Sequence, residues 1–182
     1  ITLRSIIMLS VGNQFPDFNL TAVNGTSPES FSAATLASYG ADWKIIFFWP
    51  KDFTFVCPTE IAGFGKLEGE FKDRDAVLIG ASTDSDFVHA AWRGSHADLK
   101  PLTFPWLADI KKELSNALGI LNNDAGVANR ATFIVDPQNI IRYAEMTDMS
   151  VGRNPVETLR ILDALQTDEL CPCNWNKGDA TL

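Results

Sequence analysis

The sequence predicts an α/β fold in which helices flank a mixed central β-sheet. Short runs of β-branched and aromatic residues alternate with stretches in which apolar residues recur every three or four positions, a pattern typical of strands followed by amphipathic helices. The last two strand-like runs are separated only by a four-residue turn. This order predicts parallel crossover connections first and an antiparallel hairpin last.

The first half of the chain holds the first strands and the first helix. Residues 11–23 alternate well enough for an early strand or hairpin, and the Gly/Ser/Thr/Pro-rich stretch that follows, to Tyr39, is typical of a loop. Residues 42–50, DWKIIFFWP, have the composition of a buried strand that is closed by a proline. A helical face follows, made by Ile61, Phe64, Leu67 and Phe71.

The second half completes the pattern and ends in a tail. The order of elements is that of a thioredoxin-like α/β fold, so we expect one thioredoxin-like domain over residues 9–166 and a C-terminal tail over residues 167–182. The elements predicted here are a strand at 76–83, a helix at 84–96 with an Asp/Ser cap, a helix at 109–120 that ends near Gly119, two strands within 131–146 joined by the turn Asp136–Asn139, and a helix at 154–170 capped by Asn154 with Pro155 first.

Composition excludes several classes of function. The chain of 182 residues has 15 basic and 23 acidic residues, a formal charge of −8, which disfavours nucleic acid or an anionic membrane as the main partner. Its longest apolar runs are far shorter than the ~20 residues that span a bilayer. The opening ITLRSIIMLS is not a convincing signal peptide, and Met8 is a candidate natural start, so the fold prediction does not extend to residues 1–7.

Three cysteines are too few, and odd in number, for a disulfide-stapled secreted scaffold. Two of them, Cys171 and Cys173, form a CPC sequence, whereas Cys57 stands alone at the end of PKDFTFVC. A reducing compartment with reactive thiols fits this pattern better, and we expect a cytoplasmic protein.

The position of Cys57 favours a reactive thiol. If Cys57 is the helix N-cap, Pro58 takes the first and Glu60 the third helical position; if Thr54 is the N-cap, Cys57 takes the third. Both frames place the sulfur among free N–H groups at the positive end of the helix dipole, although a buried, inert cysteine is the competing interpretation. A helix end raises the thiolate fraction by about thirtyfold, or ~2 kcal/mol, so an efficient enzyme needs a further cation.

The stretch FFWPKDFTFVCPTE contains Pro-x-x-x-Thr-x-x-Cys and resembles the peroxidatic motif of the typical 2-Cys peroxiredoxins. The resemblance continues through GVANRATFIVDP, SVGRNPVETLRILDALQ and LCPCNW, over roughly residues 11–175. It implies a peroxidatic Cys57, a shielding Pro50 and an orienting Thr54. It also supplies the cation, Arg130, which on its own sequence context is more consistent with a surface arginine.

The resemblance implies further roles around this cysteine. Glu60 and Arg153 are expected to steady the site as a pair, with an ordinary surface salt bridge as the alternative. Cys57 is expected to attack a hydroperoxide and become a sulfenic acid, without metal, flavin or nicotinamide. Trp92 matches a family position near the site, although an aromatic residue on an amphipathic helix is usually core.

The tail is expected to carry the second redox step. The resemblance implies that Cys171 resolves the sulfenic acid of a partner subunit in a homodimer, and that the tail is mobile. For Cys173 a second resolver, an electron relay and a bystander thiol all remain open, and a zinc site built on the CPC sequence is a weaker alternative. His89 and His96 are more consistent with solvated or partly buried helix positions than with a general base.

The predicted function is therefore a thiol peroxidase that reduces hydrogen peroxide and organic hydroperoxides at the expense of a protein dithiol. The reductant could be thioredoxin, a flavoprotein or a small dithiol protein, and the assembly a ring of ten or twelve subunits. SHADLKPLTFP replaces the Gly-Gly-Leu-Gly segment of eukaryotic relatives, and the given sequence has no terminal Tyr-Phe helix, which predicts resistance to overoxidation. A thiol–disulfide oxidoreductase is disfavoured because Cys-Pro-Thr-Glu replaces Cys-x-x-Cys, and a redox-switched chaperone activity could coexist.

Overall fold

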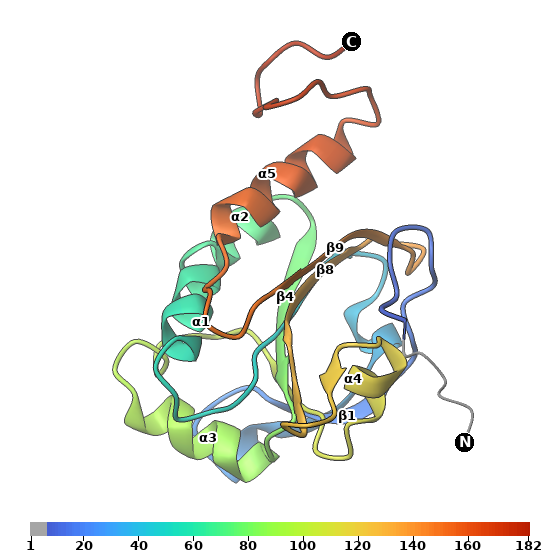
Figure 1. Ribbon diagram of the computed structural model, residues 1–182. Helices are drawn as coiled ribbons and strands as arrows, with labels where there is room; N and C mark the ends of the chain where they lie inside the picture. The colour runs from blue at the N-terminus through green and yellow to red at the C-terminus, as the bar shows by residue number, and fades with distance from the viewer. Residues whose placement is uncertain (1–6) are drawn as a thin grey trace, which may run out of the picture.

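A seven-stranded sheet forms the centre of the molecule in the computed structural model, which describes residues 7–182 (Figure 1). Most of the N-terminal stretch left out of the fold prediction, residues 1–6, lies outside the described residues. The strand order is β2-β1-β5-β4-β3-β8-β9. The strands are β1 (Asn19–Val23), β2 (Phe31–Thr35), β3 (Trp43–Phe48), β4 (Ala76–Ser82), β5 (Trp106–Ala108), β8 (Arg130–Val135) and β9 (Ile141–Thr147), and β6 (Leu121–Asn122) pairs with β7 (Val127–Ala128) in a separate ribbon.

The sheet is mixed, as predicted. Strands β3, β4 and β5 run parallel, whereas β8 is antiparallel to β3, and β9 is antiparallel to β8. At the other end β1 pairs antiparallel with both β5 and β2. The hairpin turn forms at the predicted position because the Asp136 carboxylate accepts hydrogen bonds from the N–H groups of Gln138 and Ile140.

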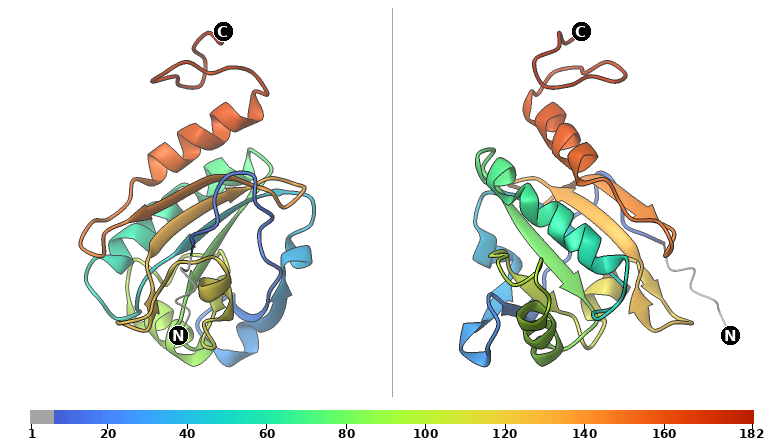
Figure 2. Two further views of the ribbon diagram at one scale, coloured as in Figure 1. Left: turned by 45° about the vertical axis from the view of Figure 1, so that its right-hand side comes forward. Right: turned by 90° about the vertical axis from the view of Figure 1, so that its left-hand side faces the viewer.

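Two hydrophobic cores lie on the two faces of this sheet. Alternate side chains of β3 divide between them: Ile45 and Phe47 enter one core, and Ile46 and Phe48 the other. The first core includes residues of α1, α2, α3 and α5, and the second includes residues of α4 and the N-terminal hairpin (Figure 2). The helices are α1 (Cys57–Lys66), α2 (Glu68–Lys72), α3 (Asp86–Ser95), α4 (Glu113–Ala117) and α5 (Pro155–Gln166), with 3₁₀ turns at Pro28–Ser30 and Leu36–Tyr39.

Two predicted helix starts are confirmed by their caps. The Ser85 side chain accepts a hydrogen bond from the Val88 N–H at the start of α3. The Asn154 side chain does the same for the Val156 N–H at the start of α5, with Pro155 at the first helical position.

Other element predictions were wrong, and each has a local cause. The predicted loop to Tyr39 contains β2, an edge strand whose small polar residues hide the strand pattern. The helix expected at 109–120 shortens to α4, because β5 precedes it and the Asp109 carboxylate accepts hydrogen bonds from Leu114 and Ser115. The helical face through Phe71 is split at Leu67 into α1 and α2, and α5 ends at Gln166 instead of residue 170.

Within residues 7–182, none of the helices combines the length and the apolar character that crossing a membrane requires.

Candidate active site

Cys57 is the first residue of α1, and its side chain is buried. Val56 occupies the N-cap position, so Pro58 is the second helical residue and neither predicted capping frame is right in detail. Both frames were right that the sulfur lies in the first turn, where backbone N–H groups lack helical acceptors. The local sequence thus places a thiol where negative charge is favoured.

Arg130 supplies a cation at this thiol. It is the first residue of β8, and its guanidinium Nη1 donates a hydrogen bond to Cys57 Sγ over 3.3 Å. The same Nη1 donates to Glu60 Oε2 at 2.5 Å, and Nε donates to the Met149 carbonyl at 2.9 Å. Arg130 is only 4% exposed, so the surface position that its sequence context favours is wrong.

Glu60 joins two arginines beneath the cysteine. Its Oε1 accepts hydrogen bonds from Arg153 Nε at 2.8 Å and from the Arg153 backbone N–H at 2.9 Å. Arg153 also donates to the Ala131 carbonyl, so one carboxylate connects α1, the start of β8 and the segment before α5. Both partners are buried, so the alternative of an ordinary surface salt bridge is wrong.

The formal charges of this cluster leave room for one anion. Two guanidinium groups and one carboxylate sum to +1 in a buried site, where an uncompensated charge is costly. A thiolate on Cys57 brings the sum to zero. The net charge of the cluster and the direct hydrogen bond from Arg130 both favour negative charge at the position of the sulfur.

The loop before α1 places the other motif residues beside the cysteine. Pro50 is buried at its start, whereas the Thr54 hydroxyl donates a hydrogen bond to the Lys51 carbonyl at 3.0 Å. The predicted orienting role of Thr54 therefore has no hydrogen bond to Cys57 in this conformation. Trp92 is buried in the same core cluster as Cys57 and packs on Phe53 of the loop, with ring centroids 5.8 Å apart.

Asp52 and His89 form a buried pair that the sequence analysis missed. His89 is fully buried, which corrects its prediction as a solvated or partly buried residue, and its Nδ1 lies 2.7 Å from Asp52 Oδ2. Burial raises the pKa of the Asp52 carboxyl above its usual value, although His89 opposes the shift. The available signal was the position of Asp52 inside the PKDFTFVC stretch.

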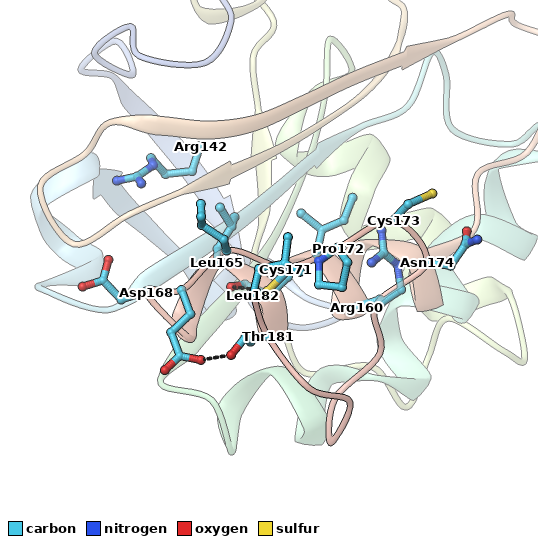
Figure 3. A pocket seen from close by; sticks show the side chains of 14 residues that line it. Arg142, Arg160, Leu165, Asp168, Cys171, Pro172, Cys173, Asn174, Thr181 and Leu182 are labelled. Atoms are coloured by element: carbon cyan, nitrogen blue, oxygen red, sulfur yellow. Dashed lines mark hydrogen bonds between the residues drawn. The ribbon is translucent and has the colours of Figure 1, made fainter.

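The two tail cysteines lie at the end of α5. The half-buried Cys171 contacts the Ala164 carbonyl at 3.7 Å and Thr167 Oγ1 at 3.5 Å through its sulfur. Cys173 is exposed, and both residues line a pocket between the tail and α5 (Figure 3). In this conformation the tail contacts α5: Arg160 donates to the Trp175 carbonyl at 2.8 Å, and Trp175 is buried, while the mobility of the tail stays a prediction.

Within one subunit, Cys57 and the tail cysteines lie at opposite ends of α5. Gly152, just before α5, lies next to Val56, since a Cβ placed on it would be 3.6 Å from Val56 Cγ1. Cys171 contacts Ala164, and the nine residue steps from Pro155, the first residue of α5, to Ala164 correspond to about 14 Å of helix. Figure 1 shows the same separation between the start of α1 and the tail. A disulfide within one subunit would require the tail to detach and run back along the helix.

The chain is similar to known proteins over most of its length. A model of the AhpC/TSA family matches residues 11–144. Proteins named alkyl hydroperoxide reductase C from Mycolicibacterium smegmatis and Mycobacterium tuberculosis are each 56% identical over 184 residues, covering 96% of this chain and 94% of the relative.

Solved structures show the same similarity. The chain matches Mycobacterium tuberculosis AhpC with a TM-score of 0.86 and 54% identity, over 93% of this chain and 100% of that one. It matches a reduced 2-Cys peroxiredoxin from Plasmodium vivax with a TM-score of 0.88 and 33% identity, over 94% of this chain and 91% of the other.

Proposed function

We propose a residue-level mechanism for this chain, which belongs to the AhpC/TSA family and is a cysteine-dependent peroxidase of the peroxiredoxin type. The observation that carries it is the 3.3 Å hydrogen bond from Arg130 to the sulfur of Cys57 at the N-terminus of α1. The substrates are hydrogen peroxide and organic hydroperoxides, and the names of the relatives specify alkyl hydroperoxides.

In the first step Cys57 is the nucleophile. Its thiolate attacks the terminal oxygen of the hydroperoxide, and the O–O bond breaks with its electron pair going to the departing oxygen. That oxygen takes up a proton and leaves as water or an alcohol, while Cys57 becomes a sulfenic acid. Arg130 and the N–H groups of the first turn stabilise the developing negative charge, with Pro50 shielding the thiolate and Thr54 orienting the substrate.

In the second step Cys171 of a partner subunit resolves the intermediate. Its thiol attacks the sulfur of the Cys57 sulfenic acid, water leaves, and an intersubunit disulfide forms. The separation of the two thiols along α5 supports a partner subunit as the source of Cys171. A protein dithiol then reduces the disulfide by thiol–disulfide exchange, and the exposed Cys173 next to Cys171 is a candidate relay for this step.

The assembly that this chemistry needs is a homodimer. Strand β9 lies at one edge of the sheet, with Met146 46% exposed, and an open edge offers unpaired backbone groups to a second strand. Pairing of β9 with its symmetry mate would extend the sheet across two chains, and such dimers would assemble into a ring of ten or twelve subunits. In this proposal residues 9–166 form the catalytic domain, residues 167–182 form the redox tail, and the enzyme works in the reducing cytoplasm.

Cysteine variants test the proposal. We expect Cys57→Ser to abolish peroxide consumption, because no other thiol lies at the N-terminus of α1. We expect Cys171→Ser to abolish the disulfide-linked dimer on a non-reducing gel after one equivalent of peroxide. Mixing Cys57→Ser with Cys171→Ser subunits and then oxidising should restore a linked dimer, since each supplies the cysteine that the other lacks.

Two results would contradict specific parts. Peroxide turnover by Cys57→Ser would contradict the assignment of Cys57 as the nucleophile. A linked dimer of undiminished yield in Cys171→Ser would assign resolution to Cys173, which Cys173→Ser in the same assay then tests.

A further inference from the structure

A turn that begins at the last residue of β9, residues 147–151, holds the arginine at the active cysteine. Arg130 Nε donates to the carbonyl of Met149 at 2.9 Å, while Nη1 of the same guanidinium faces Cys57 and Glu60. Because a guanidinium is planar and rigid, fixing Nε also fixes the direction in which Nη1 points. The position of the Met149 carbonyl therefore determines how Arg130 meets the sulfur.

Asp148 gives this turn its shape. Its Oδ1 accepts hydrogen bonds from the Ser150 backbone N–H at 2.9 Å and from the Ser150 hydroxyl at 2.6 Å. Asp148 and Ser150 are the two neighbours of Met149 in the chain, so these bonds close the turn around Met149. The Val151 N–H donates to the Asp148 carbonyl at 3.0 Å, and the Thr147 hydroxyl donates to the Val151 carbonyl at 3.2 Å. An aspartate that closes a turn in this way restrains the peptide groups between its two partners.

The register of the sheet places the turn against the site. Thr147, the last residue of β9, is the partner of Arg130 across the β8–β9 ladder. On its other side the turn leads through Gly152 to Arg153, which bonds to Glu60 by both backbone and side chain. The five-residue turn is thus fixed at both ends to the groups that surround Cys57.

We propose that Asp148 is a positioning residue for peroxide reduction, acting through the Met149 carbonyl and Arg130 on Cys57. Asp148 is exposed and does not face the sulfur, so it acts only by holding the turn. The inference rests on the proposed function, since it assumes that Arg130 assists Cys57. Hydrogen bonds from Ser150 lower the pKa of the Asp148 carboxyl, which keeps the acceptor ionised at neutral pH.

The test measures the second-order rate constant for oxidation of Cys57 by hydrogen peroxide in stopped flow. We expect Asp148→Ala to lower it about fivefold, the effect of weakening one hydrogen bond in the site. Asp148→Asn keeps an oxygen acceptor at Oδ1 and should remain within about twofold of the wild type. The matched control is Asn122→Ala, which removes a comparable turn contact, from the Ala125 N–H to Asn122 Oδ1 at 3.0 Å. Neither of these two residues hydrogen-bonds to Cys57, Glu60 or Arg130, so the rate constant should not change.

A double variant separates positioning from general structure. A lysine at position 130 has no equivalent of the arginine Nε that donates to the Met149 carbonyl. Adding Asp148→Ala to Arg130→Lys should therefore not lower the rate constant any further. An unchanged rate in Asp148→Ala, equal losses in Asp148→Asn and Asp148→Ala, or full additivity with Arg130→Lys would each overturn the inference. If Arg130→Lys itself reacts as fast as the wild type, the proposed role of Arg130 fails instead.

Discussion

At the scale of single residues, Glu60 is the connection on which the site depends. Its two oxygens accept hydrogen bonds from different arginines, and only one of these arginines contacts Cys57. The carboxylate therefore has two effects: it balances part of the positive charge, and it holds Arg130 at the angle that reaches the sulfur.

We predict that Glu60→Gln both destabilises the fold and slows the peroxidase. The amide leaves two buried guanidinium groups without a counterion, so the free energy of unfolding should fall by about 3 kcal/mol in urea titrations. The matched control is Glu70→Gln, which removes the exposed carboxylate of an ion pair with Arg74. Arg74 keeps its bonds to Asp163, so the substitution should cost under about 0.5 kcal/mol. Equal effects of the two substitutions would show that the burial of Glu60 carries no extra energy.

At the scale of elements, the packing of β4 against the end of β3 fixes where the active-site loop begins. A Cβ placed on Gly80 of β4 would lie 2.7 Å from Trp49 Cζ3 and 3.2 Å from Phe104 Cε2. Trp49 immediately precedes Pro50, and its Nε1 donates to Asp52 Oδ1 at 2.7 Å. The bare backbone at Gly80 therefore makes room for the ring that anchors the loop.

Substituting alanine for Gly80 and for Gly69 should change the free energy of unfolding in opposite directions. Gly80→Ala should lower the free energy of unfolding by about 1–3 kcal/mol, because the surrounding rings are fully buried and have little freedom to move. A Cβ placed on Gly69 of α2 would have no atom within 4 Å. Gly69→Ala should therefore raise the free energy of unfolding by about 0.5–1 kcal/mol, since alanine is the better helix former. Urea unfolding of both variants checks the signs, and a neutral Gly80→Ala would show that Trp49 moves aside freely.

The sequence predicted the elements whose signals are local. The strands β3, β4, β8 and β9 and the caps of α3 and α5 are encoded within a few residues, and so is the placement of Cys57. Strand β5 has only three residues, and β2 lacks apolar alternation, so neither carries a period that a pattern can reveal.

The residues of the site also divide into those with a local sequence signal and those without one. Arg130 is 73 residues from Cys57 and is assigned through family resemblance, because an arginine at the start of a strand is usually exposed and nothing nearby in the sequence links it to the cysteine. The Met149 contact uses a backbone carbonyl, which every residue has, and the Asp52–His89 pair joins residues 37 positions apart. Such contacts depend on the tertiary arrangement: the position of Asp52 inside PKDFTFVC marks it as a residue near the site, but nothing in the sequence identifies His89 as its partner.

At the scale of the whole molecule, the two tyrosines report on the integrity of both ends of the sheet. Tyr39 closes the turn that follows β2, and Tyr143 lies in β9. Burial raises the pKa of Tyr39 to about 12. Burial, followed by the negative charge of Glu145, raises the pKa of Tyr143 to about 12.

We predict that both phenols titrate near pH 12 in the folded protein and near pH 10 after unfolding in urea, measured by tyrosinate absorbance. Because the folded values are raised, the stability from these groups is complete below about pH 10 and is lost as the pH rises toward about 12. Tyr39→Phe should remove half of the absorbance change, since the chain has 2 tyrosines. Titration of the folded protein in one step near pH 10 would contradict this prediction.

The charge of the cluster formed by Arg130, Glu60 and Arg153 has a consequence for the redox cycle. A cysteine sulfur in a disulfide carries no charge, so in the oxidised enzyme the cluster retains an unbalanced positive charge. In the proposed cycle the buried cluster is therefore balanced when Cys57 is a thiolate and unbalanced when it is in the disulfide, so the electrostatic energy of the cluster depends on the oxidation state of one sulfur.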